Sequence, residues 1–193
     1  RWILSLLNTL VKDVQNDLDD YEPTKAARAI AEFVGDNLSN WYVRLNRKRF
    51  WGSGNEDDKL AAYQTLYTCQ LTVAKLIAPI APFFSDRLYR DLTEGMADAE
   101  PSVHLARFPE ADEALIDAKL ESRMATAQKL TSLVLSLRKK ASIKVRQPLG
   151  KLLVPAMNDA MREEFEAVKT LVLSEVNVKE LEIASGDNEV FVK

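Results

Sequence analysis

Several residue types that define special classes of protein are nearly absent from this 193-residue chain. One cysteine, Cys69, and one histidine, His104, leave too few ligands for a disulfide framework or a Cys/His zinc site. Six glycines and seven prolines exclude collagen-like and low-complexity classes. No apolar run approaches the roughly 20 residues of a membrane span. Because Arg1 is followed at once by an amphipathic pattern rather than a signal peptide, we expect a cytoplasmic protein without a membrane partner, and a piece of a longer chain.

The 47% of apolar residues is enough for a folded core, and the charges are unevenly distributed. The net charge is −3, yet residues 41–51 (WYVRLNRKRFW) and 138–151 (RKKASIKVRQPLGK) contain several cations and no acid. Such segregation makes local positive potential possible on an acidic protein. A charge run can also be an ordinary solvated face, so both interpretations stay open at this point.

Apolar spacing predicts a mainly α fold over residues 1–142. Ile3, Leu7, Leu10, Val14 and Leu18 share one helical face. Pro79 and Pro82 must break a later helix, because proline removes a backbone donor and crowds the preceding turn. We expect helices over about 1–18, 23–50, 57–77, 83–92 and 116–137, with a connection over 93–112. Helices of this length joined by short turns predict an antiparallel helical bundle.

Residues 143–193 show a different pattern. Leu152 to Val154 and the alternating apolar residues from Val176 to Ile183 predict strands, with a helix between them. Val190 and Val192 are consistent with a further strand. The C-terminal part is therefore expected to be a small α/β unit.

The chain offers little catalytic chemistry. It has no Gly-rich phosphate loop, and a nucleophilic triad would need His104 beside a Ser or Cys. His104 falls in the connection, where we expect a packed loop residue, and Cys69 falls inside the third helix, where we expect a small core residue. We predict a binding module, with no catalytic residue, cofactor or metal site of its own.

The second helix carries the clearest functional pattern. At about 100° per residue, Ile30, Val34, Leu38, Trp41 and Leu45 share an arc that predicts the buried face. On another arc lie Asn40, Arg44 and Arg47, with Phe33 and Trp51 nearby. Amide, guanidinium and aromatic groups suit a phosphate backbone with unstacked bases. The candidate RNA-binding residues are Asn40, Arg44, Arg47, Lys48 and Arg49; the alternative is that the arginines only keep this face wet.

A second set of candidates follows the last long helix. Lys139 and Lys140 are placed near its C-terminus, where they can also complement the helix dipole. Lys144 and Arg146 alternate on a segment predicted to be extended, so both can face phosphate on one side. We add these four residues to the predicted RNA-binding set.

Six stretches of the chain together resemble the isoleucyl-tRNA synthetases. The match keeps the order of that family and spans essentially the whole chain. NWYVRLNRKRFW and NVKE favour the isoleucyl group, whereas the proline-rich break and SVHL are shared with valyl and leucyl relatives. The stretches are RWILSLLNTL (1–10), LSNWYVRLNRKRFW (38–51), LIAPIAPFFSDRLY (76–89), SVHLARFP (102–109), KVRQPLGKL (144–152) and SEVNVKELEI (174–183).

The resemblance implies the C-terminal helical anticodon-binding domain and the start of the α/β unit behind it. The family's catalytic and editing domains lie upstream. The resemblance implies that the full enzyme charges isoleucine tRNA with the help of ATP and Mg²⁺ and removes wrongly attached valine by hydrolysis, so tRNA and those domains are the implied partners. The first helix of the family bundle is expected to precede Arg1. Two alternatives remain: a valyl- or leucyl-tRNA synthetase, and a non-enzymatic helical scaffold whose basic faces dock acidic proteins.

Overall fold

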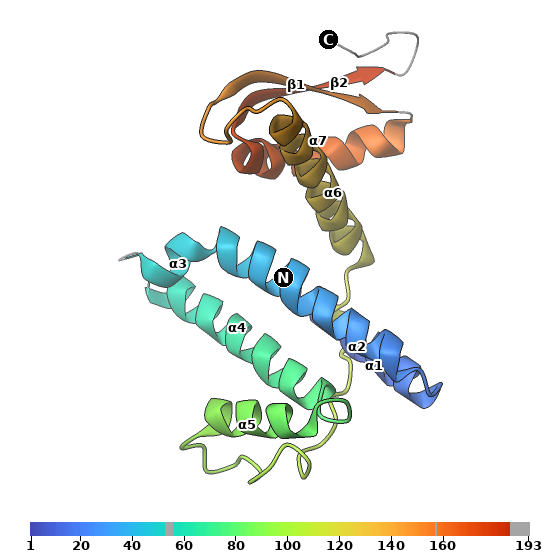
Figure 1. Ribbon diagram of the computed structural model, residues 1–193, viewed down its shortest axis with the longest axis vertical. Helices are drawn as coiled ribbons and strands as arrows, with labels where there is room; N and C mark the ends of the chain where they lie inside the picture. Colours follow the sequence, from blue (N-terminus) through green and yellow to red (C-terminus); the bar gives the residue numbers. More distant parts are fainter. Residues whose placement is uncertain (53–55, 157, 186–193) are drawn as a thin grey trace. The chain divides into compact units, whose positions relative to one another are not determined.

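The computed structural model describes residues 1–52, 56–156 and 158–185, and it divides into two compact units, Arg1–Asp117 and Ala118–Lys193 (Figure 1). The predicted fold class, a helical bundle followed by a small α/β unit, is confirmed. The division differs from the boundary predicted after residue 142. The long helix α6 (Ala118–Lys140) packs on α7 (Asp159–Val176), so it belongs to the second unit.

Helices make up the first unit, and prolines set two of their starting points. Pro23 and Pro82 each occupy the first turn of a helix, where the missing N–H would have had no partner. The helix before Pro82 ends at Leu76, as the proline-rich stretch predicts. The elements are α1 (Trp2–Asp19), α2 (Pro23–Glu32), η1 (Phe33–Val43), α3 (Arg47–Trp51), α4 (Glu56–Leu76), α5 (Pro82–Thr93) and the short η2 (Glu113–Leu115).

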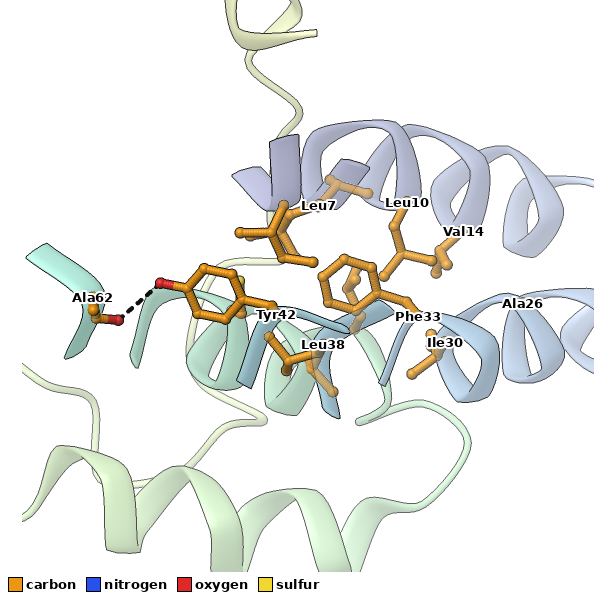
Figure 2. Packing of buried hydrophobic residues seen from close by; sticks show 14 of the residues in the cluster. Leu7, Leu10, Val14, Ala26, Ile30, Phe33, Leu38, Tyr42 and Ala62 are labelled. Atoms are coloured by element: carbon orange, nitrogen blue, oxygen red, sulfur yellow. Dashed lines mark hydrogen bonds between the residues drawn. The ribbon is translucent and has the colours of Figure 1, made fainter. Parts of the chain in front are cut away.

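The core of this unit lies between α1, α2, η1 and α4 (Figure 2). The predicted face of α1 is buried, with Leu7 and Val14 4% and 0% exposed. The Tyr42 hydroxyl donates a hydrogen bond to the Ala62 carbonyl at 3.1 Å, which ties η1 to α4. Each fully buried leucine or isoleucine stabilises the fold by about 1.5 to 3 kcal/mol.

The segment η1 is a π-helix, and it changes which side chains face the core. A π-helix bonds residue i to i+5, so its buried positions are spaced more widely than in an α-helix. Phe33 and Leu38, five residues apart, are 2% and 6% exposed, whereas Val34 is 37% exposed. The prediction that Val34 is buried and Phe33 lies on the arginine side is therefore wrong.

The second unit contains α6 and a strand–helix–strand arrangement, as predicted. Among the described residues, β1 (Leu149–Ala156) and β2 (Val178–Ser185) pair in parallel, with Leu149 opposite Val178. The crossover helix α7 is capped at its N-terminus by Asn158, whose Oδ1 accepts from the Met161 amide at 2.8 Å. The further strand predicted at Val190 and Val192 lies outside the described residues.

Candidate nucleic-acid interface

The first candidate surface consists of Asn40, Arg44, Arg47, Lys48 and Trp51, and all five side chains are exposed; we call it the first basic surface. A turn at Asn46 divides it: the backbone of Asn46 leaves the helical conformation, with φ −90° and ψ 11°, and its Nδ2 donates to the Tyr42 carbonyl at 2.7 Å. The helix predicted to continue to Phe50 therefore ends here, and α3 begins at Arg47.

Each of the two exposed arginines lies against a tryptophan. The Arg44 guanidinium is 5.9 Å from the centre of the Trp41 ring, and its Nε donates to the Asn40 carbonyl at 2.8 Å. Arg47 lies 5.5 Å from the centre of the Trp51 ring. Contacts of this kind stabilise by about 0.5 to 1 kcal/mol at exposed sites. Trp41 itself is only 8% exposed, which confirms its prediction as a core residue.

Trp51 lies on this surface, although the predicted RNA-binding set does not include it. It is 70% exposed, although the neighbouring Phe50 is buried. Phe50 packs edge-on against Trp51, Tyr42 and Tyr63, with ring centres 6.0, 6.2 and 5.1 Å apart. The indole is therefore held in place while its surface stays open. The available signal was its spacing of four residues from Arg47, which places both on one helical face.

Arg49 has a different role from its neighbours. Its Nε and Nη2 bind Oδ2 and Oδ1 of Asp58 at 2.7 and 2.5 Å, and Nη1 binds Oδ1 of Asn46 at 2.8 Å. The hydrogen bond from Arg49 holds the pKa of Asp58 below its ordinary value. The structure thus uses this guanidinium to join α3 to α4, whereas its assignment to the RNA-binding set stays a prediction.

The second candidate surface consists of Lys139, Lys140, Lys144 and Arg146, all exposed; we call it the second basic surface. Lys139 and Lys140 end α6, as predicted. The expected extended segment is wrong, because the Gln147 amide donates to the Lys144 carbonyl at 3.0 Å and closes a turn. Lys144 and Arg146 therefore extend from a turn, and strand alternation does not set their directions.

The remaining chemically distinctive residues have structural surroundings. Cys69 is 0% exposed, and burial raises the pKa of its thiol to about 12, so it is a core residue as predicted and a poor nucleophile. The Asp86 carboxylate accepts from Ser102 Oγ at 2.6 Å and from the Val103 amide at 3.1 Å, which docks the segment before His104 on α5.

The part of the chain that the structure describes contains no group of three or more His, Cys, Asp or Glu side chains that could hold a metal ion. It also contains no helix with the length and apolar character needed to cross a bilayer. The geometry thus consists of two exposed cationic surfaces, one of them with an aromatic side chain.

The family described as the anticodon-binding domain of tRNA ligase matches residues 1–153. The chain belongs to this family. It is 59% identical to the isoleucine–tRNA ligase of Bacteroides fragilis over 194 residues, and 55% identical to that of Porphyromonas gingivalis over 193. It is 50% identical to the isoleucine–tRNA ligase of Dehalococcoides mccartyi over 182 residues.

These alignments cover 100%, 100% and 94% of the chain but only 17 to 18% of each relative. The resemblance inferred from the six stretches is thus confirmed, and it applies to one segment of a much longer type of protein. Exposed cations and an exposed indole suit an anticodon-binding domain, because such domains bind a polyanion with accessible bases.

Proposed function

We propose that this chain binds the anticodon stem-loop of isoleucine tRNA, as the anticodon-binding part of an isoleucine–tRNA ligase. The observation that supports it best is the first basic surface, where Arg44, Arg47 and Lys48 are exposed beside Trp51 in an anticodon-binding domain. Cations bind the phosphates of the loop and set its position, whereas an exposed ring can stack on a base that has left the helical stack.

In the full enzyme this binding would act at a distance from the reaction. Energy gained at the anticodon can position the acceptor end of the tRNA at the reacting centre, which lowers the entropic part of the barrier. Charging with ATP and Mg²⁺, and editing, would belong to other domains of the same cytoplasmic enzyme.

The test is a double charge reversal in the intact protein. Arg44→Glu/Arg47→Glu should weaken binding of an isoleucine tRNA transcript and reduce the slope of log affinity against log salt by about 1.4 to 1.8, the value for two lost phosphate contacts. The matched control is Lys25→Glu/Arg28→Glu, which reverses two exposed charges on α2. A folded Arg44/Arg47 variant with unchanged affinity and slope would overturn the proposal.

Transcripts that differ only in the anticodon decide the amino-acid identity. Preference for the isoleucine anticodon supports the proposal, and preference for a valine or leucine anticodon assigns the domain to a sister enzyme. Affinity for tRNA no greater than for polyuridylate of the same length would instead favour a protein-docking scaffold.

A further inference from the structure

Arg138 is buried at the C-terminal end of α6, where it is 3% exposed. Its Nη1 donates to the carbonyls of Lys144 and Gln147, both at 3.1 Å. Its Nη2 donates to the carbonyls of Gln147, Val176 and Asn177, at 3.1, 2.9 and 3.0 Å. The carbonyls at the end of α7 carry the partial negative charge of a helix C-terminus, which compensates a buried cation. Only a planar guanidinium has enough fixed donors for this set.

The turn that starts at Lys144 is fastened through its main chain. Arg138 binds its first and last carbonyls, and Nδ2 of Asn177 donates to the carbonyl of Val145 at 2.9 Å. Three carbonyls of the four-residue turn are therefore occupied by side chains of other elements. With its main chain held in this way, the turn leaves the side chains of Lys144 and Arg146 exposed.

Along the sequence, the charges on both sides of this turn have one sign over a long interval. No Asp or Glu occurs between Glu121 and Asp159, whereas that interval contains the four cations of the second basic surface. Lys139 and Lys140 are the last residues of α6 and lie shortly before the turn. The helix ends there because the Ser142 amide donates to the Lys139 carbonyl at 3.1 Å and the next amide donates to the Arg138 carbonyl at 2.9 Å. The second basic surface is thus a short cationic segment whose main chain is held by hydrogen bonds.

We propose that Arg138 is a positioning residue for RNA binding: by holding the turn against the end of α7, it presents Lys144 and Arg146, with Lys139 and Lys140, to the phosphates of the bound tRNA. The inference rests on the proposed function, because it takes the tRNA backbone as the ligand of this second surface. Arg138 itself touches no phosphate, because its Nη1 and Nη2 groups donate to main-chain carbonyls. Its contribution is the geometry of the turn.

The experiment measures the affinity of the intact protein for an isoleucine tRNA transcript over a range of salt concentrations. Lys144→Gln/Arg146→Gln should reduce the slope of log affinity against log salt by about 1.4 to 1.8, since two phosphate contacts are lost. Arg138→Lys keeps the charge but cannot bind the same carbonyls, so it should reduce the slope by a similar amount. Adding Arg138→Lys to the double variant should change the slope little further, because the residues act through the same contacts.

This non-additivity separates positioning from a general loss of stability, which would weaken binding equally in every background. Combined with Arg47→Gln on the first basic surface, Arg138→Lys should instead have its full effect. Lys119→Gln/Lys129→Gln removes two exposed charges elsewhere on α6 and should leave the slope unchanged. If Arg138→Lys fails to fold, Asn177→Gly keeps the left-handed backbone, loses only the bond to Val145, and should reduce the slope by a smaller amount.

A folded Arg138→Lys variant with the wild-type slope would overturn the inference, and so would a wild-type slope for Lys144→Gln/Arg146→Gln. In both cases a continued effect of Arg44→Glu/Arg47→Glu would leave the proposed function standing. If Arg44→Glu/Arg47→Glu also binds tRNA with unchanged affinity and slope, the proposed function fails as well.

Discussion

Arg49 and Asp58 form a two-point ion pair that joins α3 to the first turn of α4, with N···O distances of 2.7 and 2.5 Å. Asp58 also lies where a helix favours negative charge. Lys48, the residue before Arg49, is exposed. A run of cations that looks uniform in the sequence is therefore divided between structure and surface.

This division predicts opposite effects for two neighbouring substitutions. Arg49→Gln should lower the urea midpoint of the first unit and leave the salt dependence of tRNA binding unchanged. Lys48→Gln should leave the midpoint unchanged and reduce the salt slope by about 0.7 to 0.9. Tryptophan fluorescence reports the midpoint of this unit alone, because the chain's three tryptophans are Trp2, Trp41 and Trp51. A reduced slope for Arg49→Gln would show that its ion pair opens to RNA.

The π-helical segment predicts that two adjacent residues differ sharply in their contribution to stability. Phe33→Ala should destabilise the first unit by about 3 to 5 kcal/mol, because it removes a buried ring. Val34→Ala should change stability by no more than about 0.5 kcal/mol, since Val34 is partly exposed. Urea unfolding followed by tryptophan fluorescence measures both. If the two costs were reversed, the segment would be α-helical in solution.

These two residues also show where sequence reasoning succeeds and fails for the fold. The face of α1 and the helix break before Pro82 follow from local rules, because regular spacing and a missing donor act within one element. The hydrogen-bond register of residues 33–43 does not follow from local rules. The same apolar residues fit either register, and packing against α1 and α4 decides between them.

The candidate sites show the same limit at the level of single charges. Both cationic runs are visible in the sequence, and most of their members are exposed as predicted. The partners of Arg49 and Arg138 are not visible, because a carboxylate nine residues away and carbonyls 38 and 39 residues away come close only in the folded chain. The exposure of Trp51 beside the buried Phe50 likewise depends on the packing of Phe50 against Tyr42 and Tyr63.

Acid should weaken the first unit through carboxylates whose folded pKa is depressed. A hydrogen bond from Arg49 lowers the pKa of Asp58, one from Ser102 lowers that of Asp86, and one from Lys12 lowers that of Glu113. A depressed folded pKa contributes stability above the ordinary value of about 4, and that stability is lost as the pH falls through the folded value. The melting temperature should therefore decrease once the pH is lower than about 4.

Asp58→Asn isolates one member of this set. The variant should melt lower than the wild type at neutral pH, and its melting temperature should fall less steeply in acid, because one of the depressed carboxylates is gone. The effect is expected to be small, since the pair is partly exposed. Thermal scans between pH 7 and pH 3 measure it; parallel curves for the two proteins would mean that Asp58 does not contribute.

Ser142 offers a stabilising substitution at the end of α6. Its φ is 57°, and the bonds from the amides of Ser142 and Ile143 to Lys139 and Arg138 form the arrangement that glycine usually closes. Ser142→Gly removes about 1 to 2 kcal/mol of left-handed strain and loses roughly 0.4 to 1 kcal/mol to the more flexible unfolded chain, so the middle of the two ranges gives a net gain of about 0.8 kcal/mol.

The matched control is Ser136→Gly, on the exposed side of the same helix, which should cost roughly 0.5 kcal/mol because glycine is a poor helix former. Amide hydrogen exchange of peptides from α6 measures both, since the second unit contains no tryptophan or tyrosine. Exchange in the last turns should slow about two- to fivefold in Ser142→Gly and quicken in Ser136→Gly. Faster exchange in both variants would show that the left-handed position costs less than the glycine adds in chain entropy, and that the serine there is already close to the best choice.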